Sequence, residues 1–152
     1  MRNRLRSGMR SHRGHRTHTT MTNLIPAGRR VGNNGDMKVL IILNDAPYGG
    51  ERAYNGLRTA MTLQKEHGAD VRVFLFADAI WAAASGQKTP DGYYNVERML
   101  KAIVAKGGQI KLCGSCADAR GFDREKAVPG VLIGSMPELA DWVVEAEKSL
   151  VF

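Results

Sequence analysis

The chain changes its pattern of apolar and polar positions after residue 36. From there on, continuous apolar runs alternate with stretches whose apolar residues lie three or four positions apart. The first pattern is typical of strands that are covered on both faces, and the second of amphipathic helices. The sequence therefore predicts strands at Val39–Leu43, Val71–Phe76, Gln109–Leu112, Val131–Ile133 and Leu150–Phe152.

The stretches between these strands predict helices. Ala53, Leu57, Ala60 and Met61 form the stripe of one helix, and the spacing from Val96 to Val104 indicates another that ends at Gly107-Gly108. Residues 79–84 suit a short helix, whereas residues 85–94 (SGQKTPDGYY) suit a loop because of their Gly and Pro content.

The last predicted helix has the clearest start signal. Ser135 and Glu138 form a capping box around Pro137, and the apolar stripe that follows consists of Leu139, Trp142, Val143 and Ala146. Strands that alternate with helices in this order need crossover connections, so their pairing is parallel. We expect a three-layer α/β fold with about five mostly parallel strands and helices on both faces.

The first 36 residues differ in composition from the rest. Residues 1–35 hold eight arginines and no acid, whereas residues 36–152 hold 14 basic and 15 acidic side chains, so the net charge of +7 belongs to the tail. With few apolar residues to bury, residues 1–36 are predicted to be a disordered basic extension that is dispensable; a presequence or a nucleic-acid-binding arm is the alternative. His12, His15 and His18 could bind a metal but are expected to be solvated.

Residues 37–152 are expected to form a single α/β domain. They carry almost no net charge, which makes nucleic acid an unlikely partner, and no run of about 18 apolar residues predicts a membrane span. Two cysteines are too few for a secreted disulfide scaffold. We expect a soluble cytoplasmic protein that does not bind a membrane.

Candidate chemistry gathers after the ends of the predicted strands. In an open parallel sheet, ligands bind beyond the carboxyl ends of the strands. This rule places Asn44 and Asp45, Asp78, and Cys113 on one rim of the sheet. Asn44, Asp45 and Asp78 could shape a pocket there, or could be turn and cap residues.

The only two cysteines form the C-x-x-C motif Cys113-Gly-Ser-Cys116. Four roles compete for them: a redox disulfide, half of a zinc site, a sulfur-carrying nucleophile, and two small buried side chains. Zinc needs about four ligands, and His67 is the only histidine in residues 37–152, so neither a metal nor another cofactor is expected. The motif also comes after two strand-helix units, which is too late for a thioredoxin-like protein.

Several separated motifs resemble the DsrE/DsrF-like family, in particular its YchN-like branch. They are MKVLIILNDAPYGGERAYNGLR, VRVFLFADA, GQKTPDGYYNVERML, CGSCADARG and SMPELADWVVEAEKSLVF, and they cover nearly all of residues 37–152. The resemblance implies a flavodoxin-like domain that assembles into trimers or hexamers. It also implies a sulfur relay, with sulfur-donor and sulfur-acceptor proteins as partners.

The resemblance transfers the role of sulfur carrier to Cys113, because the carrier cysteine of the family stands eight residues before the glycine of an Arg-Gly pair, here Arg120-Gly121. Arg120 would stabilise the thiolate. Cys116 departs from the family's sulfur-relay subunits and could act as a resolving thiol. We therefore expect a persulfide carrier of sulfurtransferase type, whose status as an enzyme the sequence leaves open. The alternatives are a thiol-disulfide redox switch and a non-enzymatic oligomeric binding module.

Overall fold

The computed structural model describes residues 37–152. The expectations for residues 1–36, including the disorder and the three histidines, lie outside the described residues. Within the described residues, no helix has the length and the apolar character that crossing a bilayer requires.

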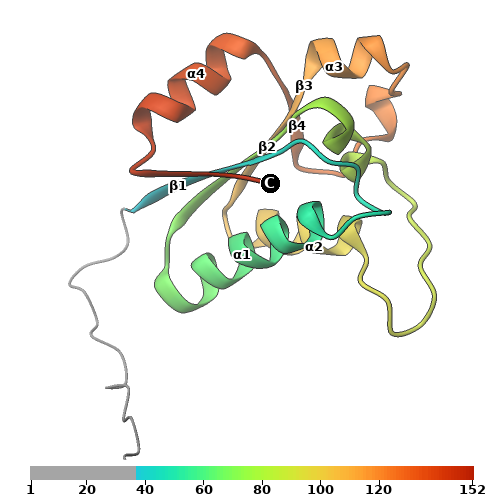
Figure 1. The fold of residues 1–152 in the computed structure, drawn as a ribbon, viewed down its shortest axis with the longest axis horizontal. Helices are drawn as coiled ribbons and strands as arrows, with labels where there is room; N and C mark the ends of the chain where they lie inside the picture. Colours follow the sequence, from blue (N-terminus) through green and yellow to red (C-terminus); the bar gives the residue numbers. More distant parts are fainter. Residues whose placement is uncertain (1–36) are drawn as a thin grey trace, which may run out of the picture. The chain divides into compact units, whose positions relative to one another are not determined.

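A parallel sheet of five strands forms the centre of the described part (Figure 1). Its strand order is β4-β3-β2-β1-β5, and every neighbouring pair is parallel. The predicted α/β class and strand number are confirmed. The strands span Lys38–Leu43 (β1), Asp70–Leu75 (β2), Gln109–Cys113 (β3), Val131–Gly134 (β4) and Lys148–Val151 (β5).

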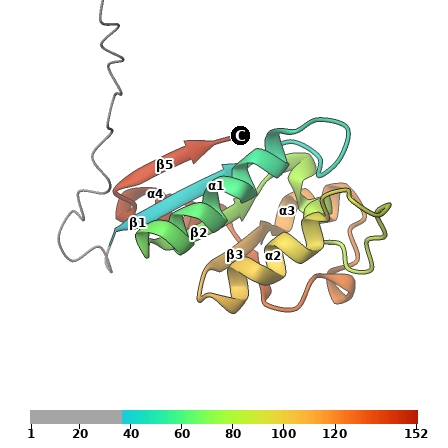
Figure 2. The same ribbon diagram turned by 90° about the horizontal axis from the view of Figure 1, so that it is seen from below.

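Helices cover both faces of this sheet, as predicted. Helices α1 (Arg52–His67) and α2 (Val96–Ala105) lie side by side on one face, and α4 (Met136–Glu145) lies on the other (Figures 1 and 2). Three short helices complete the fold: the 3-10 helix η2 (Ala77–Ala83), the α-helix α3 (Gly114–Ala119) and the 3-10 helix η3 (Arg124–Lys126). The chain order explains the arrangement, because β1 to β4 advance in one direction while α4 returns across the opposite face to β5.

Helix α4 is held to the sheet through Trp142. The Arg72 guanidinium lies 5.4 Å and the Lys111 ammonium 4.8 Å from the centroid of the indole ring, and Phe74 meets the ring edge-on. The predicted capping box is present, because Ser135 and Glu138 each accept a backbone N–H of the other. The predicted apolar stripe is wrong at Val143, which is 45% exposed because it points away from the sheet.

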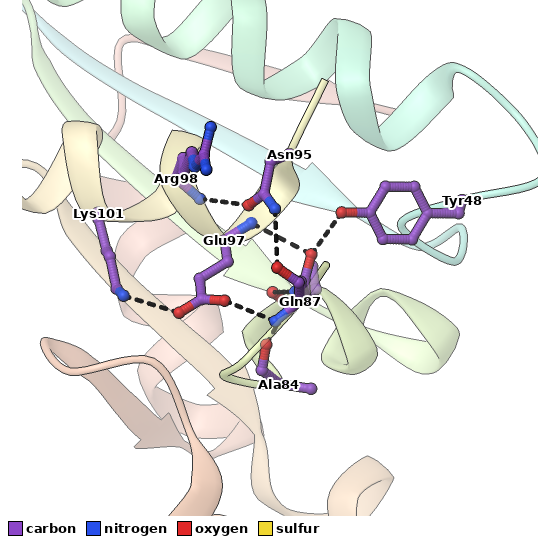
Figure 3. A network of polar contacts seen from close by, with 8 residues as sticks. Tyr48, Ala84, Gln87, Asn95, Glu97, Arg98 and Lys101 are labelled. Atoms are coloured by element: carbon purple, nitrogen blue, oxygen red, sulfur yellow. Dashed lines mark hydrogen bonds and ion pairs between the residues drawn. The ribbon is translucent and has the colours of Figure 1, made fainter. Parts of the chain in front are cut away.

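The loop at residues 85–94 is ordered by Gln87 (Figure 3). The Gln87 side-chain amide donates to the carbonyls of Ala82 and Ala84, and its oxygen accepts the Tyr48 hydroxyl at 2.6 Å. The Glu97 carboxylate accepts the Gln87 backbone N–H at 2.8 Å. One side chain thus joins the loop after β1, η2 and the start of α2.

Candidate functional site

The cysteine motif lies where β3 runs directly into α3. Cys113 is the last residue of the strand, and its sulfur accepts the backbone N–H of Cys116 at 3.2 Å, which caps the helix. The Cα atoms of Cys113 and Cys116 are 5.2 Å apart, and the two sulfurs form a disulfide. The motif therefore brings its two sulfurs into bonding contact through one turn of helix.

The surroundings of Cys113 differ from the expectation of an accessible edge. In this disulfide form Cys113 is only 5% exposed and belongs to the hydrophobic core, whereas Cys116 is half-buried. Tight pairing of β3 with β4, which sets Cys113 opposite Gly134, covers the strand end. The Cys113 sulfur nevertheless has polar neighbours, since the Ser115 hydroxyl lies 3.3 Å away and the Cys116 N–H points at it.

Arg120 lies beside the motif but not on the Cys113 sulfur. Its Nε donates to Asp78 Oδ1 at 2.7 Å, and its Nη1 donates to the Cys116 carbonyl at 3.5 Å. The structure thus brings together four of the six predicted residues: Asp78, Cys113, Cys116 and Arg120. Ala77, which directly precedes Asp78, has a φ of +46°. This left-handed conformation is rare for alanine, and it turns the chain after the end of β2.

The remaining two candidates lie further along the rim. The Asn44 backbone N–H donates to the Phe152 carbonyl at 2.9 Å, and its side-chain amide donates to the same oxygen at 3.5 Å. Asp45 pairs with Arg52 at 3.5 Å. Both follow β1, and β2 separates β1 from β3 in the sheet. Asn44 and Asp45 therefore act at the β1–β5 end of the rim and not around the cysteines.

Two further residues at the cysteine motif were not predicted from the sequence. Ser115 places a hydroxyl at the Cys113 sulfur, and its position inside the C-x-x-C was the available signal. Arg124 donates to the Gly114 carbonyl at 3.2 Å and pairs with Asp118 at 2.5 Å. No local pattern could have indicated Arg124, because the chain must fold back through η3 to reach Gly114. Arg120 and Arg124 thus each donate to a backbone carbonyl of α3.

Across residues 37–152, no group of three or more His, Cys, Asp and Glu side chains could hold an ion. The site offers a dithiol pair, a nearby hydroxyl and two guanidinium groups, and this set suits thiol exchange.

Comparison with known proteins decides the family. The sequence model of the DsrE/DsrF-like family matches residues 37–152. The chain belongs to this family. Protein YchN of Escherichia coli strain K12 is 42% identical over 116 residues, which are 76% of this chain and 98% of YchN. An uncharacterized protein of Methanopyrus kandleri is 36% identical over 114 residues, 75% of this chain and 93% of that protein.

Solved structures agree with this assignment. The crystal structure of YchN from Escherichia coli matches with a TM-score of 0.73 and 41% identity, over 76% of this chain and 99% of that one. A conserved protein of unknown function from Bacteroides thetaiotaomicron shares the fold at 16% identity, with a TM-score of 0.54 over 76% of this chain and 94% of that one. The resemblance seen in the sequence is confirmed at the level of the family and the fold.

Proposed function

We propose that this protein carries sulfane sulfur as a persulfide on Cys113. In the loading step the Cys113 thiolate attacks the terminal sulfur of a donor persulfide, R–S–SH. The donor S–S bond breaks, R–S⁻ leaves, and Cys113–S–SH forms with no net oxidation or reduction. The observation that carries the proposal is the polar environment of the Cys113 sulfur, which has an N–H and a hydroxyl within 3.3 Å.

Hydrogen bonds to a thiolate favour the charged form, whereas burial opposes it. The 5% exposure of Cys113 means that loading needs the side chain to turn outward after the disulfide is reduced. Reduction frees this rotation, because the bond to Cys116 no longer fixes the sulfur. A dithiol reductant supplies the two electrons and leaves the chain as Cys113–SH and Cys116–SH.

Cys116 is proposed as the resolving thiol. Its thiolate attacks the inner sulfur of Cys113–S–SH, a Cys113–Cys116 disulfide forms, and hydrosulfide leaves with the charge. The short Cα separation of 5.2 Å supports this step, because disulfides require Cα atoms within about 7 Å. Transfer to an acceptor thiolate would compete with this release, so Cys116 limits how long the sulfur is held.

Intact mass spectrometry of the reduced protein tests the loading step. After incubation with glutathione persulfide, Cys116→Ser should gain one sulfur atom, the wild type should finish as the Cys113–Cys116 disulfide, and Cys113→Ser should gain no sulfur. An unlabelled Cys116→Ser variant, or equal uptake by Cys113→Ser, would refute the role of Cys113.

A second candidate function is a thiol-disulfide switch, which the Cys113–Cys116 disulfide favours. This function uses the same pair without sulfane sulfur: two thiols lose two electrons and two protons to an oxidant such as a peroxide or a disulfide. The same mass measurement separates the two functions. Because both functions leave the wild type as the Cys113–Cys116 disulfide, the Cys116→Ser variant decides between them. A gain of one sulfur atom on this variant supports carriage, whereas no gain supports the switch and contradicts carriage.

We also propose that the protein is a cytoplasmic homo-oligomer, a trimer or a hexamer, that meets donor and acceptor proteins. Exposed apolar side chains on both edge strands and on α4 support an assembly: Leu132, Met136, Val144 and Val151. Light scattering after size exclusion should give three or six copies, and a monomer at micromolar concentration would contradict the assembly. The same measurement on a chain that begins at Met37 tests whether residues 1–36 are dispensable.

A further inference from the structure

A groove lies between α1 and α2, on the face of the sheet opposite α4 (Figure 2). Its volume is about 410 Å³. This volume lies within the usual range for small-molecule sites, roughly 300 to 1,000 Å³. Its walls come from α1, α2 and the loop between η2 and α2: Tyr54, Arg58, Met61, Tyr93, Tyr94, Asn95, Arg98 and Met99.

A stack of tyrosines forms one wall of this tyrosine-arginine groove. The ring of Tyr94 stacks on that of Tyr54 with centroids 4.2 Å apart, and Tyr93 and Tyr48 lie 5.8 and 5.7 Å from Tyr94. Tyr93 is 66% exposed, so the stack continues to the surface with an uncovered ring. Burial raises the pKa of Tyr94, with a smaller contribution from Glu51.

Two arginines also line the groove, and the Arg58 guanidinium lies 5.6 Å from the centroid of the Tyr54 ring. Arg58 and Arg98 are exposed, and neither forms an ion pair with another residue in 37–152. The acid nearest to Arg98 in the chain, Glu97, faces away from the groove, because it binds the Gln87 N–H and the Lys101 ammonium (Figure 3). The two arginines therefore keep their positive charge.

Two smaller hollows extend the same groove in both directions. One of about 220 Å³ shares Arg58 and Met61 and adds Lys106 and the ion pair Lys65–Glu66. The other, of about 230 Å³, shares Tyr93 and Tyr94 and adds Tyr48 and Glu51. The groove is thus continued by a tyrosine beyond Tyr94 and by basic side chains, one of them paired with an acid, beyond Arg58.

We propose that the tyrosine-arginine groove binds a planar aromatic molecule that carries a phosphate, of the nucleoside monophosphate class. The flat ring of such a ligand stacks on Tyr93 and Tyr94, since base-aromatic stacking contributes about 1 to 3 kcal/mol. Its phosphate reaches Arg58 and Arg98, whose planar guanidinium groups suit two-point contacts with phosphate oxygens. A ligand with both a flat ring and a phosphate would use the exposed ring of Tyr93 as well as the two arginines.

This binding function is separate from sulfur carriage. None of the lining residues belongs to the cysteine motif, and the groove is built by the helices α1 and α2. The two proposals can therefore fail independently. The Cys113→Ser variant should bind the ligand as the wild type does, even though it takes up no sulfur.

Isothermal titration calorimetry with adenosine 5′-monophosphate on the full chain tests the proposal. We expect saturable binding that is about tenfold weaker for adenosine and for ribose 5-phosphate, because each lacks one of the two contacts. Arg98→Ala and Tyr93→Ala should each weaken binding by about tenfold, since both side chains are exposed and their loss leaves the fold intact. Arg52→Ala is the matched control, because Arg52 is an exposed arginine on α1 outside the groove, and it should bind like the wild type.

Four results would overturn the proposal. No saturable binding of adenosine 5′-monophosphate would remove the ligand class, and equal affinity for ribose 5-phosphate would reduce the groove to an anion site. Equal losses in Arg98→Ala and Arg52→Ala would show non-specific attraction by the net charge. Binding of a single-stranded RNA oligonucleotide without binding of the mononucleotide would point to a different, macromolecular partner and would also contradict the proposal.

Discussion

At the residue scale, the site depends on polar groups placed against the Cys113 sulfur. The Ser115 hydroxyl lies 3.3 Å from that sulfur, and Ser115 itself is exposed. Such a hydroxyl can stabilise the thiolate without a role in folding. Ser115 therefore offers a way to change the chemistry of Cys113 and leave the core untouched.

We predict that Ser115→Ala slows the uptake of sulfur by Cys113 by roughly tenfold, the effect of losing one hydrogen bond to a charged group. The rate is measured by mass spectrometry at fixed concentrations of glutathione persulfide. The free energy of unfolding should change by less than about 0.5 kcal/mol, because the side chain is exposed. Unchanged uptake in a folded Ser115→Ala protein would remove the hydroxyl from the mechanism.

Gln87 is the residue on which the loop before α2 depends. Replacement by alanine removes four side-chain hydrogen bonds and leaves the Tyr48 hydroxyl and the Glu97 N–H without this partner. Buried groups that lose a partner cost about 1 to 3 kcal/mol each. Gln87→Ala should thus lower the free energy of unfolding by about 2 to 4 kcal/mol in urea titrations.

The neighbouring Lys88 supplies the control for this variant. Lys88 is exposed, and Lys88→Ala should change stability by less than about 0.5 kcal/mol. A loss in Gln87→Ala as small as that expected for Lys88→Ala would show that the loop tolerates substitution and that Gln87 does not organise it.

At the element scale, α4 is fixed by its cap and by a charged contact. The Glu138 carboxylate accepts hydrogen bonds from the hydroxyl and the backbone N–H of Ser135. It also accepts one from the Lys111 ammonium at 2.6 Å. The Lys111 hydrogen bond and then those from Ser135 lower the pKa of Glu138 from 4.5 to about 2. Because the folded state favours the carboxylate, the contact stabilises the protein above pH 4.5, and this contribution is lost as the pH falls from 4.5 towards 2.

Glu138→Gln isolates this charge, since glutamine can still form the capping box. The wild type should be more stable than Glu138→Gln at pH 7, and the two curves of unfolding free energy against pH should meet as the pH approaches 2. Asp141→Asn, on an exposed position of α4, should follow the wild type throughout. A difference that persists at the lowest pH would show that the carboxylate charge is not responsible.

The packing of α1 on the sheet gives a second prediction for an element. A Cβ at Gly56 would lie within 3.1 Å of the Phe152 ring and closer still to Leu43. Gly56→Ala should cost about 1 to 3 kcal/mol through overpacking, although alanine favours helices. Gly50→Ala, where nothing lies within 4 Å, should leave thermal unfolding unchanged. A Gly56→Ala protein as stable as the wild type would mean that α1 is more loosely packed than described.

At the scale of the whole molecule, apolar patterning predicted most of the fold. All five strands lie within two residues of their expected ranges, because a strand buried on both faces leaves a continuous apolar run. The start of α4, directly after β4, was also visible in the sequence as the capping box of Ser135 and Glu138. Element type and order are local properties, and the parallel topology follows from them.

The site was less predictable because it depends on contacts between distant segments. The strand-end rule placed Asp78, Cys113 and Asn44 on one rim, but it could not say that Asp78 pairs with Arg120, 42 positions away. The burial of Cys113 depends on pairing between β3 and β4, which no feature of the motif reveals. The hydrogen bonds of the Gln87 side chain could likewise not be predicted, because the sequence identified this loop only by its Gly and Pro content.

The most direct test of sulfur carriage by the cysteine pair is a single turnover with one equivalent of glutathione persulfide, followed with a sulfide-sensitive electrode. The reduced wild type should release about one hydrosulfide per chain and finish as the Cys113–Cys116 disulfide, whereas Cys116→Ser should keep its sulfur and release none. Formation of the disulfide in the wild type without sulfur passing through Cys113, or sulfide release that is undiminished in Cys113→Ser, would contradict the account.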